Sequence, residues 1–265
     1  MSIHPTAVIN PSATIGNNVR IGPFAVIGAG VTIGNDTQLG PHAVILSNTK
    51  VGDSCQIHSH AVLGDAPQDV AYNGALTRVE IGNKVVIREG VTIHRGTKEG
   101  TITRVADGCF LMANSHLAHN VNLGEKVIVA NGALLAGYVE VGAGVFISGN
   151  AVVHQFCHIG RLAMLGGASA VSKDVPPFCT AATGEYNRIA GLNVIGLRRA
   201  GFTSEERLEI KRAFDLLYRS GLTPAQAIER IKTGLPAGPA QEIAEFAEAS
   251  KRGVCSMARG ASADE

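Results

Sequence analysis

Four of the nine histidines fall within residues 94–154, and two of them are only three residues apart. They are His94, His116, His119 and His154, and Gln155 follows the last of them. A neutral imidazole accepts a proton near neutral pH, so it suits general-base attack by a weak nucleophile such as a hydroxyl. A lone surface histidine is more often just solvated, so this chemistry requires a fold that brings these residues together.

A six-residue repeat is the main organising feature of the chain. Stepping by six from Ile3 to Val171, 26 of 29 positions are Ile, Leu or Val, and the exceptions are Asp69, Ala75 and Glu99. Four positions after each aliphatic residue comes a small or β-branched residue, and Cys55, Cys109 and Cys157 occupy this position. Helices repeat near 3.6 and simple strands near 2, so a period of six predicts short strands joined by corners.

Three hexads make one triangular coil of 18 residues, whose stacked strands pair in parallel about 4.8 Å apart. We therefore predict an all-β parallel β-helix over residues 1–177, with about ten coils and loop insertions near 64–80 and 98–104. The second predicted unit, 178–265, has an irregular segment over 178–197 and then an α-helical C-terminal domain. Its first helix spans 204–220 with Ser204 as the N-cap, and others begin near Thr223-Pro224 and Pro239.

Equivalent positions on adjacent coils are 18 residues apart and form a column along the rod. His119, Gly137 and Gln155 share one column, and Tyr138 and His154 flank it. His94 falls about seven residues off this column, so we expect it at another corner, remote from His119 within one subunit. A site that uses both would lie between subunits, which favours a cyclic homotrimer.

Composition excludes several classes of protein. The net charge of +1 gives no overall field for nucleic acid, and no apolar run approaches a membrane span. The first thirty residues lack a signal pattern, so we expect a cytoplasmic protein. The five cysteines are odd in number and well separated, which disfavours disulfides or a zinc ribbon.

A zinc site of the carbonic-anhydrase type, shared across a trimer, stays an alternative for the histidines. His116 and His119 argue against it, because in an extended segment their side chains point to opposite faces. Neither a cysteine nor a carboxylate joins them in sequence. We predict no metal.

Several motifs together resemble one family, the bacterial UDP-N-acetylglucosamine O-acyltransferases that start lipid A synthesis. They are Thr92-Ile-His-Arg-Gly96, His116-Leu-Ala-His119, Val153-His-Gln-Phe-Cys157, Gly166-Gly167, Asp174-Val-Pro-Pro177 and Gly196-Leu-Arg-Arg199. The resemblance covers essentially the whole chain and implies a left-handed coil. It also implies transfer of an (R)-3-hydroxyacyl chain from acyl carrier protein to the sugar 3-hydroxyl.

The resemblance assigns roles to individual residues. It makes His119 the general base and the Gly137 N–H the donor to the oxyanion, with no cofactor beyond the phosphopantetheine of acyl carrier protein. A glycine at Gly167 leaves room for a long acyl chain. The implied substrate contacts are Gln68, Asp69, His94, His116, His154, Gln155, Asn193, Arg198 and Arg199, the two arginines meeting the diphosphate.

Some positions depart from the family pattern. Ala71 stands where the family often has Lys, Tyr138 replaces a histidine, and Asn120 follows the base where Asp often supports it. Ile195 and Ala200 stand where Glu and Arg are common. These differences keep open transfer to the 3-amino sugar analogue.

Two further interpretations remain: a coenzyme A-dependent acetyltransferase on the same scaffold, and a non-enzymatic scaffold protein. The histidine constellation disfavours the scaffold protein, and the helical tail favours the use of acyl carrier protein, which is acidic. A basic cluster near the tail fits such a partner, although glutamates are interleaved with it. Its members are Arg188, Arg198, Arg199, Arg207, Lys211 and Arg212.

Overall fold

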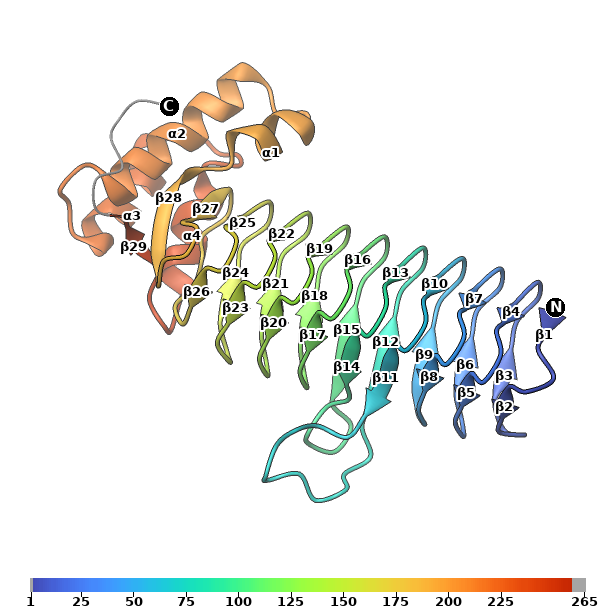
Figure 1. Cartoon of the computed structure of the whole chain (residues 1–265). Coiled ribbons are helices and arrows are strands. Elements are labelled where there is room, and N and C mark those ends of the chain that lie inside the picture. The colour runs from blue at the N-terminus through green and yellow to red at the C-terminus, as the bar shows by residue number, and fades with distance from the viewer. Residues whose placement is uncertain (1, 259–265) are drawn as a thin grey trace.

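The computed structural model describes residues 2–258 as a three-sided rod closed at one end by helices (Figure 1). Residue 1 of the first predicted unit and residues 259–265 of the second lie outside the described range. The N-terminus begins at the open end of the rod, and the helices α1 to α4 gather at the other end (Figure 1). The rod is a left-handed parallel β-helix, so the predicted fold class is confirmed.

Each side of the rod is one sheet of short parallel strands. The first sheet contains β1 (Ser2–Ile3), β4 (Arg20–Ile21), β7 (Gln38–Leu39), β10 (Gln56–Ile57), β13 (Val86–Ile87), β16 (Phe110–Leu111), β19 (Ile128–Val129), β22 (Phe146–Ile147), β25 (Met164–Leu165) and β27 (Cys179–Ala181). The second contains β2 (Val8–Ile9), β5 (Val26–Ile27), β8 (Val44–Ile45), β11 (Val62–Asp65), β14 (Thr92–His94), β17 (His116–Leu117), β20 (Leu134–Leu135), β23 (Val152–Val153) and β26 (Ala170–Val171). The third contains β3 (Thr14–Ile15), β6 (Thr32–Ile33), β9 (Thr49–Val51), β12 (Arg78–Ile81), β15 (Ile102–Val105), β18 (Asn122–Leu123), β21 (Glu140–Val141) and β24 (His158–Ile159).

The hexad produces this geometry directly. From the second coil onward its aliphatic residue points into the prism and is almost fully buried, as Ile27, Leu117 and Leu135 illustrate. The small slot is buried beside it, and Cys55, Cys109 and Cys157 occupy that slot as predicted. Burial of each aliphatic side chain stabilises the fold by roughly 1.5–3 kcal/mol.

The two insertions leave the rod at the same corner, between the second and third sheets. Val62 on β11 pairs with Thr92 on β14, 30 positions on, whereas Thr92 pairs with His116 on β17, 24 positions on. The other two sheets show the same offsets of 30 and 24 across these coils, whereas coils without an insertion pair residues that are 18 apart, as Leu117 and Leu135 are. The extra residues form two loops, 66–77 and 95–101, and the first projects far from the rod (Figure 1).

The segment after Pro177 is more ordered than the sequence predicted. β27 pairs in parallel with β25, so the first sheet continues beyond residue 177. β28 (Arg188–Leu192) then pairs antiparallel with β27, and β29 (Ser256–Met257) adds to β28. The short helix α1 (Val194–Arg199) follows. The prediction that 178–197 is irregular was therefore wrong, because pairing with the end of the sheet overrides the weak local pattern.

The remaining helices are α2 (Ser204–Tyr218), α3 (Pro224–Gly234) and α4 (Gln241–Ala249). Thr203, not Ser204, is the N-cap of α2, and it forms a complete capping box with Glu206. The partial cap predicted at Ser204 was thus one residue too late. Thr223 caps α3 with proline in the first turn, as the sequence indicated. Arg161 binds Glu242 of α4 through two nitrogens, which ties the cap to the last coils.

Candidate functional site

His119 lies at the corner that follows β17, on the side of the rod from which both loops project. The residue is 9% exposed. The ring Nδ1 is 3.1 Å from Asn120 Oδ1, and Nε2 is 3.8 Å from Asp69 Oδ2 on the loop 66–77. One ring nitrogen therefore faces the coil and the other faces a carboxylate that the loop brings over it.

Gly137 lies one coil further along the column, directly against the His119 ring. A Cβ at this position would come within 2.2 Å of His119 Cε1 and 2.5 Å of Nε2. Only glycine leaves room for the imidazole there.

The N–H of Gly137 is available because of its place in the coil. Pro11 occupies the same corner slot in another coil, Pro5, Pro23 and Pro41 occupy the equivalent slot at the corner between the first and second sheets, and proline has no N–H. Within residues 2–258, no backbone-to-backbone hydrogen bond starts from the Gly137 nitrogen. The geometry thus leaves one main-chain donor free beside Nε2.

His94 lies in the same cluster, contrary to the prediction that it occupies another corner. Its ring meets that of His116 edge to face, with 4.8 Å between centroids. The 24-residue offset between β14 and β17 places residue 94 opposite residue 118, next to His119. An 18-residue coil was the wrong spacing here, because the loop 95–101 adds six residues. His94 therefore gives no support for a site between subunits.

His116 and His119 lie on the same side of the rod, so the expectation of opposite faces was also wrong. The strand ends at Leu117, and the chain turns through Asn120, whose φ is +61°. Burial, and then the nearby His94 and His119, lower the pKa of His116 to about 4. Burial is also the main cause that lowers the pKa of His94. Both rings are neutral at physiological pH.

Neutral buried imidazoles need polar partners. His116 Nδ1 is 2.7 Å from Thr92 Oγ1, whereas His94 Nδ1 is buried without a hydrogen-bond partner in the described part of the chain. A buried polar atom without a partner costs about 1–3 kcal/mol, and a bound polar ligand would remove that cost. His94 Nδ1 is thus an unsatisfied polar atom inside the histidine cluster.

Two residues at the site were missed from the sequence. Thr97, on the loop 95–101, donates its N–H and its hydroxyl to Asn120 Oδ1, each at 3.1 Å. Its Oγ1 also lies 2.8 Å from the Tyr138 hydroxyl. The motif Thr92–Gly96 stops one residue short of Thr97, and only the projecting loop indicated that this region carries function. Arg95 is the other, because it binds Tyr72 and Gly64 and so joins the two loops.

The remaining predicted residues are spread along the same corner. Gln68 is exposed on the loop 66–77, next to Asp69. His154 and Gln155 are exposed at the corner after β23, one coil beyond Gly137. His154 Nδ1 lies 3.1 Å from Gln155 O and 3.4 Å from the Arg252 guanidinium.

Four predicted residues lie elsewhere on the chain. Asn193 caps α1 by accepting from Gly196 N and donating to Leu162 O. Arg198 and Arg199 are exposed on α1. Gly167 lies at the corner between β25 and β26, where an added Cβ would meet only Gly149 O, at 3.8 Å. These residues belong to the first sheet side of the rod, not to the corner of His119.

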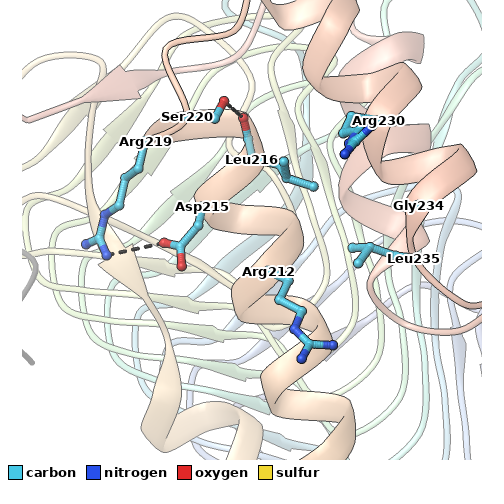
Figure 2. Close-up of a pocket in the computed structure, with 8 residues that line it drawn as sticks. All are labelled: Arg212, Asp215, Leu216, Arg219, Ser220, Arg230, Gly234 and Leu235. Atoms are coloured by element: carbon cyan, nitrogen blue, oxygen red, sulfur yellow. Dashed lines mark hydrogen bonds and ion pairs between the residues drawn. The ribbon is translucent and has the colours of Figure 1, made fainter.

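At the helical end, two cavities are lined by residues of α1, α2 and α3. One, of about 850 Å³, is enclosed by β28, α1 and α2 and includes Asn193 and Arg198. The other, of about 480 Å³, lies between α2 and α3 (Figure 2). Arg212, Arg219 and Arg230 line the second, and Arg219 pairs there with Asp215 at 3.3 Å. Neither cavity contains a residue of the histidine cluster.

Over residues 2–258, no three His, Cys, Asp or Glu side chains are grouped so as to hold a metal ion. The same residues contain no helix of the length and apolarity needed to cross a membrane.

Comparison with known proteins matches the chain along its length. Residues 2–29 and 30–65 match the family model for the bacterial transferase hexapeptide, and residues 174–255 match that for UDP-N-acetylglucosamine O-acyltransferase, domain 2. The acyl-[acyl-carrier-protein]–UDP-N-acetylglucosamine O-acyltransferase of Alkalilimnicola ehrlichii is 51% identical over 95% of this chain and 98% of its own. The enzyme of that name from Gloeothece citriformis is 47% identical over a shorter stretch, 64% of this chain and 62% of its own.

A solved structure shares the fold over its full length. The UDP-N-acetylglucosamine acyltransferase of Francisella novicida superimposes with a TM-score of 0.92 at 37% identity, covering 98% of this chain and 95% of that one. The full-length match to the Alkalilimnicola protein decides the assignment. This chain belongs to the family of the acyl-[acyl-carrier-protein]–UDP-N-acetylglucosamine O-acyltransferases.

Proposed function

We propose that this chain transfers an (R)-3-hydroxyacyl group from acyl carrier protein to the 3-hydroxyl of UDP-N-acetylglucosamine, the first step of lipid A synthesis. The observation that carries this proposal is the close packing of Gly137, whose N–H has no main-chain acceptor within residues 2–258, against the His119 ring, beside a loop carboxylate. A base and an oxyanion donor side by side suit acyl transfer to a hydroxyl. The names of the relatives supply the donor and acceptor.

The mechanism uses the two sides of the His119 ring. As the sugar O3 attacks the thioester carbonyl carbon, its proton passes to Nε2, which contributes about 10²–10⁴-fold. The carbonyl oxygen becomes an oxyanion and accepts from the Gly137 N–H, a donor worth about 3–4 kcal/mol. Collapse breaks the carbon–sulfur bond, and the imidazolium returns the proton to the phosphopantetheine thiolate. No covalent acyl-enzyme is formed.

The neutral histidines and the loop suit substrate binding. The neutral His116 ring offers an uncharged hydrogen-bond partner, which suits an uncharged sugar or acyl hydroxyl. Asp69 Oδ2 lies 3.8 Å from His119 Nε2, so the carboxylate can accept a hydrogen bond from a sugar hydroxyl that is bound beside this nitrogen. Gln68, His154 and Gln155 line the same corner and extend the contact surface along it.

We also propose a homotrimer with active sites between subunits, for a reason other than the position of His94. Arg198, Arg199 and Gly167 lie on the side of the first sheet, whereas His119 lies at the corner between the second and third sheets. One copy does not bring these residues together. A neighbouring copy that offers its α1 and Gly167 to the His119 corner would complete a single site.

Acyl carrier protein is the proposed donor partner. Arg198 and Arg207 line the 850 Å³ cavity at the helical end and would meet an acidic partner, whereas Lys211 also lines it but is paired with Asp215 at 3.2 Å. Arg188 is engaged with Ser256 and Met257, and Arg212 is paired with Glu209, so these two contribute less.

One assay tests the activity. The purified protein is incubated with UDP-N-acetylglucosamine and 3-hydroxyacyl-acyl carrier protein, beside reactions with acetyl-coenzyme A or with the 3-amino sugar analogue. We expect transfer to the 3-hydroxyl that is lost in His119→Ala. Turnover of acetyl-coenzyme A with no transfer from the carrier protein would refute the proposal.

A mixing experiment tests the shared site. We expect His119→Ala and the double variant Arg198→Ala/Arg199→Ala each to be inactive or weak, and activity to return when they are unfolded and refolded together. A site contained in one copy would give no such recovery, because neither chain carries the full set.

A further inference from the structure

The segment between α4 and β29 crosses the rod at the corner between the second and third sheets. Its backbone is bound to the coil of β26, because the Asp174 N–H donates to Gly253 O at 3.0 Å and the Cys255 N–H donates to Asp174 O at 2.8 Å. The Ser250 hydroxyl adds a bond of 2.6 Å to the side chain of the same buried aspartate. Residues 250–255 are therefore fixed at the corner that also contains His119.

This segment carries Arg252 into the corner. The guanidinium Nε donates to Ser172 O at 2.8 Å, and Nη2 lies 3.4 Å from His154 Nδ1. Ser172 occupies the same place as His154 one coil further along, since Val153 pairs with Val171. Successive coils rise about 4.8 Å, so the guanidinium lies roughly 10–14 Å along the rod from His119.

The Arg252 guanidinium has no counter-ion in the described part of the chain. His154 Nδ1 is closer to Gln155 O, at 3.1 Å, and a ring nitrogen that donates to that oxygen has no lone pair for Arg252. Burial raises the pKa of the neighbouring Cys157 thiol to about 11, so this group is neutral. Within residues 2–258, no carboxylate pairs with Arg252. Its two Nη atoms therefore keep N–H groups without an anionic acceptor.

Lys173 adds a second cation at the same end of the corner. It is exposed at the position equivalent to Gln155, one coil further along, and none of the ion pairs of residues 2–258 includes it. The adjacent Asp174 is fully buried, and its side chain accepts from the His158 N–H at 2.8 Å and from the Ser250 hydroxyl. Two cations thus lie beside an exposed histidine, and a bound anion would reduce their repulsion.

The distance from His119 indicates which anion fits. In the proposed reaction both substrates carry phosphate. About five to seven bonds separate the sugar O3 from the two phosphorus atoms of UDP, which at roughly 1.2 Å per bond reach about 6–8 Å. About fourteen bonds separate the thioester carbon from the phosphorus of phosphopantetheine, a reach of about 17 Å when extended. The phosphopantetheine arm therefore spans the interval from His119 to Arg252, and the diphosphate falls short of it.

We infer that Arg252, with Lys173 beside it, binds the phosphodiester of the phosphopantetheine arm of the acyl donor. The identity of the donor rests on the proposed function. A guanidinium offers parallel N–H groups that match two phosphate oxygens, and the bond from Nε to Ser172 O holds it in place for this contact. Arg252 thus makes the enzyme prefer a donor that carries this phosphate.

Two donors without the carrier protein test the contact. They are 3-hydroxyacyl-phosphopantetheine, as its methyl phosphodiester, and 3-hydroxyacyl-pantetheine, which has no phosphate. We expect the wild type to use the first with a kcat/KM roughly 10–100-fold higher, the effect of charge-assisted hydrogen bonds. Arg252→Ala should lose most of this preference and use the pantetheine donor as the wild type does. That donor is the internal control for folding and for chemistry at His119.

Three comparisons sharpen the result. Arg252→Lys keeps the charge without the fork and should retain part of the preference, with a loss of about fivefold. Lys251→Ala removes the exposed neighbouring charge and should alter the preference by less than about twofold. The KM for UDP-N-acetylglucosamine should be unchanged in Arg252→Ala. A rise in that KM with the donor preference intact would place the acceptor diphosphate at Arg252 and overturn the inference.

An equal loss with both donors in Arg252→Ala would also overturn it, because a purely structural role does not discriminate between them. Calorimetric titration with phosphopantetheine and with pantetheine tests the site without acyl transfer. We expect the wild type to bind phosphopantetheine more tightly and Arg252→Ala to bind the two alike, whereas equal Kd values in the wild type would refute the site. A wild type that binds phosphopantetheine in this way but transfers no acyl group would refute only the proposed function.

Discussion

Two corners of the rod stack aromatic side chains at 18-residue intervals, and only one of them lies at the candidate site. At the corner between the first and second sheets, Phe24, His42 and His60 stack with centroids 5.0 Å apart. At the corner between the second and third sheets, Tyr138 stacks on Phe156 and packs against His119. The stacked residues have positive φ at both corners, as His42 and Tyr138 do, so the backbone of the coil is enough to produce the stacking.

The difference between the corners is the pair of loops. Phe24, His42 and His60 remain exposed at the surface, whereas His119 is buried beneath loop residues that supply Asp69 and Thr97. A regular coil repeats side chains at fixed intervals, but it supplies no segment that covers any of them. An insertion of a multiple of six residues keeps the hexads in register and adds a loop that covers His119.

Removing the imidazole should give the largest contrast between the corners. We expect His119→Ala to lower kcat about 10²–10⁴-fold, since the hydroxyl loses its base. His42→Ala is the matched control and should change kcat less than about twofold, because its ring only stacks at the surface. Steady-state assays decide this, and equal losses in the two variants would end the distinction between the corners.

Adding a single methyl group at the site should have the next largest effect. Gly137→Ala would place its Cβ within 2.2 Å of His119 Cε1, so the ring must move. We expect kcat to fall about 10²-fold, the cost of a misplacement of about 1 Å. Gly191→Ala is the control, because a Cβ there meets nothing within 4 Å. Full activity in Gly137→Ala would contradict the close packing of base and donor.

The corner between the first and second sheets also contains Gly167, toward the helical end of the rod. This residue tests whether that corner takes part in substrate binding. If the acyl chain of a neighbouring copy runs past Gly167, as proposed, then Gly167→Leu should shorten the preferred acyl chain. The wild type should prefer fourteen-carbon over ten-carbon donors, and the variant should reverse this by about tenfold or more. Competition between the two donors measures it. A wild type that prefers the ten-carbon donor would refute a long acyl groove.

The remaining prediction concerns stability against pH and not catalysis. His116 has a folded pKa of about 4, below the value near 6.5 of an unfolded histidine. The unfolded state therefore binds the extra proton first, and stability falls as the pH drops from about 6.5 to 4. We expect the free energy of unfolding of the wild type to fall by up to about 3 kcal/mol over this range, and that of His116→Gln not to show this fall. Denaturant titrations at pH 7 and pH 4.5 measure it, with the exposed His42→Gln as control.

Much of the rod could be predicted from local sequence. The hexad determines which residues enter the core, and the column rule placed Gly137 against His119. The same rule failed for His94, because it assumed 18 residues where the loop had made the interval 24. The order in residues 178–197 was missed because β27 and β28 are stabilised by pairing with the end of the sheet, which leaves no periodic signal.

The sequence by itself determined the repeat, the buried aliphatic residues, the glycine at the crowded corner and the histidines available for chemistry. These depend on residue type and on spacing along one regular coil. Only the tertiary structure decided which histidines meet, which carboxylate faces Nε2 and that Thr97 fixes Asn120. Those contacts join a loop to a coil, and the path of a loop depends on packing and hydrogen bonds between segments far apart in the chain.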